Sequence, residues 1–264
     1  MIKTALLTIG DSPIANAAIR ALAEYSHLEY IVYSRKKRKV SLIRRIREYG
    51  LLYSLHALIG KGFYAVSSDL DAHKFAGADV IVWDDAVSAE DILKALDGVD
   101  MVVCCLFNRV LNRSFIASFK YCVNFHPSLL PDYRGPEPIY WGLLNNEANF
   151  GLTLHHMTER IDDGNVISQS RCQRPAIPVA FLVEKKLASS ISESVQALLM
   201  QVAAGQVSAK EQGEGFYLPS PTLENIKIFE SGLPEEPAQS KHEGSTRDVH
   251  CDLPKSTDDR DGSQ

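Results

Sequence analysis

Three kinds of side chain that can act together on a carbonyl carbon occur in the middle of the chain. Asn124 and His126 are two positions apart in an apolar segment, and alternate side chains of a strand point to the same face. Pro127 favours an extended backbone at His126. Residues 162–164 form an acidic turn with the sequence Asp-Asp-Gly. An amide, an imidazole and a carboxylate brought together in this way suit acyl transfer.

When an amine attacks the carbonyl carbon of an acyl group, negative charge grows on the oxygen of a tetrahedral intermediate. Hydrogen-bond donors already in place stabilise that oxygen, and removing one donor typically costs about 2.7–4 kcal/mol. The Asn124 amide and an N–H of His126 can both donate. Asp162 can accept the proton that the amine loses, through water, or it can keep His126 charged. Each residue alone is more often structural, so the prediction rests on their combination.

Alternating apolar runs and helical stretches predict the elements that position these groups. The expected strands are residues 3–8, 28–33, 80–83, 101–106, 123–126 and 151–157. Ser12 caps a helix that begins at Pro13, a capping box at Ser88 opens another, and a long amphipathic helix over residues 179–204 ends before Gly205. This order predicts an α/β fold, a Rossmann-like and mostly parallel sheet with helices on both faces. Ligands of such sheets bind at the carboxyl ends of the strands.

Residues 124–131 have the sequence Asn-Phe-His-Pro-Ser-Leu-Leu-Pro, followed by Tyr-Arg-Gly at 133–135 and Asp-Asp-Gly at 162–164. This series resembles the signature of the folate-dependent formyltransferases, which act on methionyl-tRNA, glycinamide ribonucleotide or sugar nucleotides. The resemblance covers roughly residues 1–205. It implies that Asn124, His126 and Asp162 carry catalysis. It also implies transfer of a formyl group from 10-formyltetrahydrofolate to a primary amine.

Two neighbouring carboxylates compete for the role of the catalytic acid. The family places its acid two residues before the glycine of this turn, which selects Asp162. Asp163 stands where small residues are common in the family. We expect its carboxylate to be solvated.

The resemblance also implies a folate pocket beside this face. Its first wall is the segment after the strand at 101–106, where Val110 and Leu111 enclose the pterin ring and the backbone around Arg109 binds the ring edge. Backbone groups of residues 159–162 close the opposite side. The residues expected to bind the cofactor are Phe107, Arg109, Val110, Leu111, Glu159, Arg160 and Ile161. For any one of them, an ordinary strand-to-helix connection is the alternative interpretation.

The loop after the signature histidine is the expected acceptor-binding region. Ser128 and Arg134 are candidate substrate-binding residues, because a guanidinium can hold a phosphate or carboxylate with two hydrogen bonds. Gly135 permits a close approach of the backbone. Trp141 further along is expected to pack in the core rather than to contact a ligand.

Other chemistries lack their motifs. The chain has neither the Gly-x-Gly-x-x-Gly fingerprint of nicotinamide binding nor the Gly-x-Ser-x-Gly elbow of hydrolases. His155 and His156 are adjacent in a predicted strand and face opposite ways, so they cannot bind one metal ion together. We therefore expect no metal site.

Composition limits the class of protein. The 264 residues are 45% hydrophobic and 23% charged, as in globular domains, which excludes a wholly disordered chain or a coiled-coil rod. No run approaches the ~20 apolar residues of a membrane helix. The odd count of five cysteines, with no Cys-x-x-Cys pair, indicates reduced thiols and a cytoplasmic protein.

Charge divides the chain into three expected parts. Residues 231–264 hold eight acidic and four basic residues, and so carry most of the net charge of −5. Their few apolar side chains cannot offset the entropy of ordering them, so we expect a disordered acidic tail. The expected organisation is a formyltransferase catalytic domain over residues 1–205, a short C-terminal extension over 206–230, and the tail.

The acceptor is the open question at this level. A basic cluster over residues 35–47 lies where the tRNA-directed branch of the family carries an insertion, yet a solvated helix face explains it equally well. The acidic tail is a poor partner for RNA. We therefore expect a small amine acceptor, most plausibly an amino-sugar nucleotide, with methionyl-tRNA as the alternative. Hydrolysis of formyltetrahydrofolate is a further alternative.

Overall fold

The computed structural model describes residues 1–10, 12–35 and 77–221, all within one compact unit that extends to Pro234. The acidic tail and, apart from Arg35, the basic cluster lie outside these residues. The described elements follow the expected alternation. The strands are β1 (Lys3–Thr8), β2 (His27–Ser34), β3 (Asp79–Trp83), β4 (Met101–Cys105), β5 (Tyr121–His126), β6 (Asn149–His156) and β7 (Val166–Gln173). The helices are α1 (Pro13–Tyr25), α5 (Ala89–Ala95), α6 (Arg113–Ala117), α7 (Pro138–Leu144), α8 (Ala180–Ala188) and α9 (Ile191–Ala203).

The seven strands form one mostly parallel sheet in the order β3-β2-β1-β4-β5-β6-β7. The first five strands run parallel, whereas β6 and β7 are antiparallel to their neighbours. The expected Rossmann-like α/β fold is thus confirmed. The antiparallel pairing of β5 with β6 sets Asn124 opposite His155, which matters for the site.

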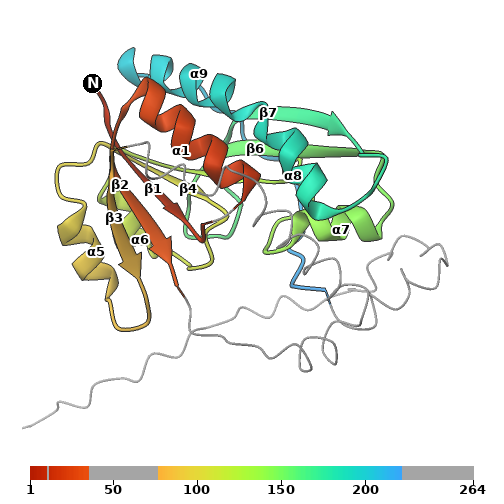
Figure 1. Ribbon diagram of the computed structural model, residues 1–264, viewed down its shortest axis with the longest axis horizontal. Coiled ribbons are helices and arrows are strands. Elements are labelled where there is room, and N and C mark those ends of the chain that lie inside the picture. Colours follow the sequence, from red (N-terminus) through yellow and green to blue (C-terminus); the bar gives the residue numbers. More distant parts are fainter. Residues whose placement is uncertain (11, 36–76, 222–264) are drawn as a thin grey trace, which may run out of the picture. The chain divides into compact units, whose positions relative to one another are not determined.

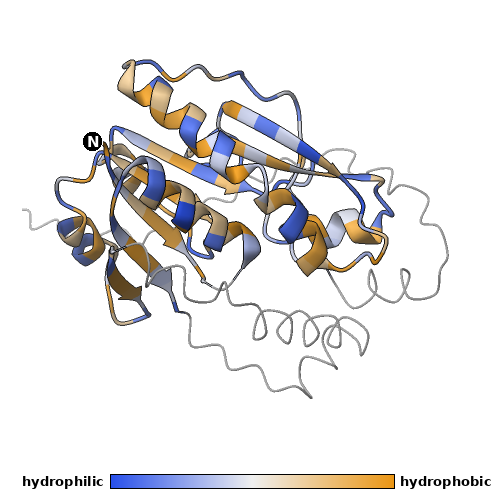
Figure 2. Cartoon of the chain, turned by 45° about the horizontal axis from the view of Figure 1, so that its top comes forward, coloured by the Kyte–Doolittle hydropathy of each residue, from blue (hydrophilic) through white to orange (hydrophobic). Residues whose placement is uncertain are grey.

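Two apolar cores lie on opposite faces of the sheet. Helices α1, α8 and α9 cover one face, and α5 and α6 cover the other (Figure 1). Adjacent residues of β1 illustrate the alternation, because Leu6 packs in the first core and Leu7 in the second. The central strands are hydrophobic along their length, whereas the helices show hydrophilic residues on their outer sides (Figure 2).

The predicted helix starts are confirmed in atomic detail. The hydroxyl of Ser12 accepts hydrogen bonds from the backbone N–H groups of Ile14 and Ala15, with Pro13 as the first residue of α1. Ser88 and Asp91 exchange the two hydrogen bonds of a capping box at the start of α5. Gly205 follows α9 with a φ of 78°, as expected of a residue that ends a helix.

The long helix expected over residues 179–204 is wrong, because two helices, α8 and α9, occupy this range. The break falls at Ser189 and Ser190. Their hydroxyls bond back to the carbonyl oxygens of Lys186 and Leu187, at 2.7 and 2.9 Å. Serine side chains that bind nearby backbone groups in this way compete with helical hydrogen bonds. In the described ranges, no helix has the length and apolar character needed to cross a membrane.

Candidate active site

A cavity of about 640 Å³ opens at the carboxyl ends of the central strands. Its walls come from the segments after β1 and β4, the end of β5, the loop before α7 and the turn after β6. This is the edge at which open α/β sheets bind ligands, and the volume is that of a typical small-molecule site. The three residues expected to act together, Asn124, His126 and Asp162, all line it.

The Asp162 carboxylate is the meeting point of these side chains. Asn124 Nδ2 donates to Asp162 Oδ1 at 3.3 Å, and His126 Nδ1 lies 3.5 Å from Oδ2. The backbone N–H of Gly135 donates to the same Oδ2 at 3.0 Å. Residues from a strand, a turn and a loop far apart in the sequence therefore converge on one carboxylate.

Hydrogen bonding fixes the tautomer of His126. Its Nε2 lies 2.9 Å from the carbonyl oxygen of Tyr133, which can only accept, so Nε2 carries a hydrogen. Burial lowers the pKa of His126, and this effect outweighs the opposing influence of Asp162 and of the Tyr133 carbonyl. The imidazole is thus neutral near pH 7 and presents the lone pair of Nδ1 toward Asp162.

The Asp162 side chain, in contrast, is charged near pH 7. Burial by itself would raise the pKa of this carboxyl. The neighbouring imidazoles of His155 and His126, and the Gly135 N–H, together lower it below the ordinary value. At neutral pH the pair is therefore a charged carboxylate beside a neutral imidazole that can take up a proton.

His155 is a site residue that the sequence reasoning did not identify. Only 2% of it is exposed, and its Nε2 lies 3.1 Å from Asn124 Nδ2 and 3.6 Å from Asp162 Oδ1. Its Nδ1 is 2.8 Å from the carbonyl oxygen of His156, so Nδ1 carries the hydrogen. The strand register could have revealed it, because an inward residue of β6 must face β5 beside Asn124.

The loop residues of the expected folate pocket line the same cavity. They are Phe107, Arg109, Val110, Leu111, Glu159, Arg160 and Ile161. Val110 is 74% exposed and Leu111 is buried. The Arg109 guanidinium binds the Ser34 hydroxyl and the Trp83 carbonyl, both at 3.0 Å. Its side chain is therefore engaged, and the backbone of this residue stays the group expected to bind a ligand.

The three expected acceptor-binding residues differ in whether they line the cavity. Gly135 lines the cavity, whereas neither Ser128 nor Arg134 does. The Ser128 hydroxyl donates to the Asp132 carbonyl at 2.7 Å and so braces its own loop. The Arg134 guanidinium pairs with Asp163 at 2.7 Å. These two side chains act within the protein in this structure.

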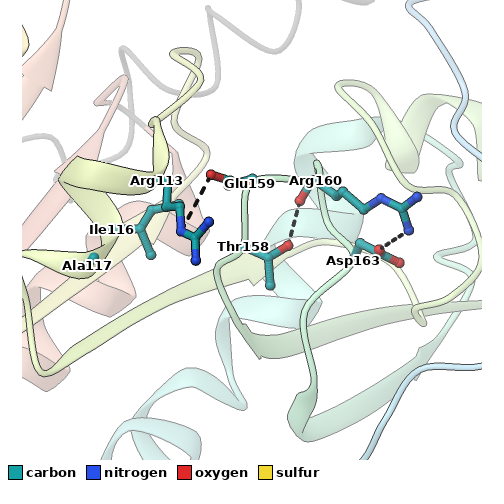
Figure 3. A pocket seen from close by; sticks show the side chains of 7 residues that line it. All are labelled: Arg113, Ile116, Ala117, Thr158, Glu159, Arg160 and Asp163. Carbon is teal, nitrogen blue, oxygen red and sulfur yellow. Dashed lines mark hydrogen bonds and ion pairs between the residues drawn. The ribbon is translucent and has the colours of Figure 1, made fainter. Parts of the chain in front are cut away.

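The pair with Arg134 also corrects the expectation for Asp163, which is not simply solvated. Arg160 contacts its other oxygen at 3.3 Å, as Figure 3 shows. That figure centres on a second pocket of about 500 Å³, which shares residues 158–160 with the main cavity. Trp141 differs from expectation too, because it is half-buried and its indole N–H donates to the Pro219 carbonyl at 2.8 Å.

Among the described residues, no group of three or more His, Cys, Asp or Glu side chains is arranged to hold a metal ion. The Asn124, Asp162, His126 and His155 side chains supply a hydrogen-bond donor, a carboxylate and two imidazoles at this cavity. This donor set matches acyl transfer to an amine.

Comparison with known proteins finds similar sequences and similar folds. A family model described as formyl transferase matches residues 78–206. Methionyl-tRNA formyltransferase of Borrelia hermsii (strain HS1 / DAH) is 30% identical over 115 residues, 42% of this chain. The match spans only 37% of that relative's length.

Solved structures share the fold at low sequence identity. Glycinamide ribonucleotide transformylase 1 from Symbiobacterium toebii superposes with a TM-score of 0.58 at 18% identity, covering 81% of this chain and 95% of its own. A 4-N formyltransferase from Francisella tularensis gives 0.54 at 18%, covering 83% and 76%. HypX from Aquifex aeolicus in complex with tetrahydrofolic acid gives 0.56 at 16%, covering 84% and 30%. Residues 78–206, just under half of the chain, thus match the formyl transferase family.

Proposed function

We propose that this protein transfers a formyl group from 10-formyltetrahydrofolate to a primary amine. The observation that carries the proposal is the convergence of Asn124 and His126 on the Asp162 carboxylate inside a cavity of about 640 Å³. The match of residues 78–206 to the formyl transferase family supports the reaction class, and the tetrahydrofolate complex of the similar HypX protein supports the donor.

The catalytic roles follow from the resting geometry. Asn124 is the donor to the oxygen that gains charge as the amine attacks. Both hydrogens of its amide are directed at Asp162 and His155, so one of these bonds is exchanged for the oxyanion. The lone pair of His126 Nδ1 accepts the proton that the amine loses, and the resulting imidazolium returns it to N10 of the folate as the bond between the formyl carbon and N10 breaks. Asp162 stabilises the imidazolium that results, at 3.5 Å from Nδ1.

Two carboxylates support a small cationic acceptor. Glu137, which precedes α7, and Glu184 of α8 line the same cavity as His126. Burial, and secondarily the charge of Glu184, raises the pKa of Glu137 to about 7. Clustered negative charge favours an amine that arrives as an ammonium and disfavours the phosphates of a large polyanion. Similar structures include sugar N-formyltransferases, which makes an amino-sugar nucleotide our preferred acceptor.

Methionyl-tRNA is the second candidate, because the curated relatives carry that activity in their names. The matched part of the chain covers 37% of those relatives, so their acceptor does not transfer with the match.

A panel of acceptors tests the proposal. The full chain is incubated with 10-formyltetrahydrofolate and an amino-sugar nucleotide, glycinamide ribonucleotide, charged initiator tRNA or no acceptor, and the formylated product is measured. We expect an N-formyl product from the amino-sugar nucleotide. Formate released at the same rate without an acceptor would instead indicate hydrolysis, and no turnover of the donor in any arm would refute formyl transfer.

A further inference from the structure

A segment beyond the family match is fastened to both sides of the site. Residues 210–219, here called the C-terminal strap, begin with Lys210 paired to Val166 through two backbone hydrogen bonds of 2.7 Å. At the other end, Leu218 N donates to the Arg134 carbonyl at 2.8 Å, and Trp141 binds the Pro219 carbonyl. The strap therefore joins the start of β7 to the loop that precedes α7.

Gln212 is the residue of the strap that reaches the acidic turn. Its Nε2 donates to the carbonyl oxygens of Asp162, at 3.0 Å, and Gly164, at 2.6 Å. Its Oε1 accepts from Arg134 Nε and Nη2, at 3.2 and 2.9 Å. Both the nitrogen and the oxygen of the Gln212 side-chain amide are therefore hydrogen-bonded, and the amide bridges the carbonyl groups on either side of Asp163.

The backbone of this turn needs such support. Asp162 has a φ of 52°, a left-handed conformation that residues with a Cβ adopt rarely. Conformations of this kind persist where the surroundings determine them strongly. Gly164 packs so closely on the carbonyl of His156 that a Cβ would lie 1.9 Å from that oxygen. The turn is therefore held between β6 on one side and Gln212 on the other.

We propose that Gln212 is a positioning residue, which holds the backbone of the acidic turn so that the Asp162 carboxylate stays against Asn124 and His126. This inference rests on the proposed function, because it assigns a residue to the same reaction. Gln212 acts on the turn through backbone carbonyls and does not itself line the cavity.

The close packing of the strap fixes the position of Gln212. A Cβ on Gly215 would lie 2.5 Å from the Pro131 carbonyl oxygen and 3.2 Å from Arg134 Cζ. The backbone of the strap thus approaches the Ser-Leu-Leu-Pro loop at a distance that suits glycine. Gly215→Ala should displace the strap without altering any polar group.

The most informative substitution is Gln212→Glu. Glutamate has the same length and keeps a partner for Arg134, but it replaces both donated hydrogen bonds with a negative oxygen facing two carbonyl oxygens. Gln206, which is exposed in the turn after α9, offers the same change as a matched control. Gln206→Glu adds the same charge without contacting the acidic turn at residues 162–164.

Steady-state kinetics and a carboxyl titration test the inference together. For Gln212→Glu we expect kcat to fall about ten- to a hundredfold, as displaced reacting groups typically cause, with little change in the donor KM. The acid limb of the kcat–pH profile should move to lower pH, because a displaced Asp162 no longer raises the pKa of His126. The pKa of the Asp162 carboxyl itself should rise, because it loses the contacts that lower it. Gly215→Ala should change kcat in the same direction, and Gln206→Glu should match the wild type.

NMR titration of the Asp162 carboxyl reports on its surroundings without any turnover. It therefore tests the positioning role of Gln212 separately from the proposed formyl transfer. A raised Asp162 pKa in Gln212→Glu supports positioning even if the wild type transfers no formyl group, which would overturn the proposed function alone. An unchanged Asp162 pKa and an unchanged kcat–pH profile in folded Gln212→Glu would overturn the positioning role.

Discussion

Asp162 is the residue on which the side chains of the site converge, since Asn124, His126 and His155 all approach its carboxylate within 3.6 Å. Asp163 faces the other way and serves a different purpose, because it pairs with Arg134 and Arg160. Two adjacent acids of one turn are thus divided between the proposed reaction centre and the framework of the protein.

This division predicts unequal effects of the two neutral variants. Asp162→Asn should lower kcat/KM about 10²- to 10⁴-fold, because the charge that stabilises protonated His126 is lost. Asp163 does not line the main cavity, so Asp163→Asn, which removes its ion pairs with Arg134 and Arg160, should cost about fivefold or less. Initial rates with the best acceptor of the panel measure both, and the reverse ranking would show that the wrong acid has been assigned.

The lowered pKa of His126 predicts a stability effect. The unfolded chain gains a proton on this residue below about pH 6.5, whereas the buried imidazole stays neutral until its lower folded pKa is reached. The free energy of unfolding should therefore decrease as the pH falls through this window. In His126→Gln the decrease should be shallower, as measured by urea unfolding at several pH values. Parallel curves for the two proteins would contradict the assigned state of the imidazole.

At the scale of elements, apolar periodicity predicts what is buried on both faces. The strands at β1 and β4 were predictable because every side chain of Met101–Cys105, and all but one of Lys3–Thr8, is buried. Strand β7 was not, because its sequence is polar and its residues are at least partly exposed. A pattern of hydrophobicity carries no signal for such a strand.

The break between α8 and α9 depends on partners that periodicity does not encode. The Ser190 hydroxyl meets both the Leu187 carbonyl and the Ser170 hydroxyl of β7, at 2.9 and 2.7 Å. Ser190→Ala should lower the free energy of unfolding by about 1 kcal/mol, the usual value of such hydrogen bonds. The exposed Ser192→Ala is the control for urea unfolding, and an equal effect in both variants would refute this explanation of the break.

The carboxylate that precedes α7 tests the acceptor side of the cavity. Glu137 has a pKa of about 7, so it is partly ionised at neutral pH and more fully ionised above it. Glu137→Gln should raise the KM for a cationic amine severalfold, because the lost ion pair with the ammonium contributes about 1 kcal/mol in a partly buried setting. The donor KM should stay unchanged. The wild-type advantage should grow between pH 6.5 and about 8. Glu90→Gln in α5 is an exposed control, and equal KM values for all three proteins would remove Glu137 from the acceptor site.

For the molecule as a whole, the sequence indicates the fold and the signature residues, while contacts between distant segments require the structure. His155 becomes a site residue only through the pairing of β6 with β5. Gln212 is one of several polar residues in a glycine-containing stretch, and its position beside Asp162 depends on the pairing of Lys210 with Val166. The partners of Arg134, Asp163 and Gln212, likewise lie in other segments of the chain.

The nature of the acceptor predicts a response to salt. Polyanionic acceptors release counterions when they bind, and their affinity falls about 10³- to 10⁵-fold between 50 and 200 mM salt when six to ten phosphates are contacted. Transfer to a small amine should change severalfold at most over this range. Rates measured at both salt concentrations distinguish the two, and a steep decline would favour tRNA.

The central claim is that the groups gathered at Asp162 perform formyl transfer rather than merely bind folate. Binding of the donor and transfer of its formyl group should be measured in parallel on the wild type and His126→Ala, the first by fluorescence titration and the second by single-turnover product formation. We predict that the variant binds the donor with similar affinity and transfers at least about a hundredfold more slowly. Transfer at the wild-type rate by His126→Ala would contradict the account.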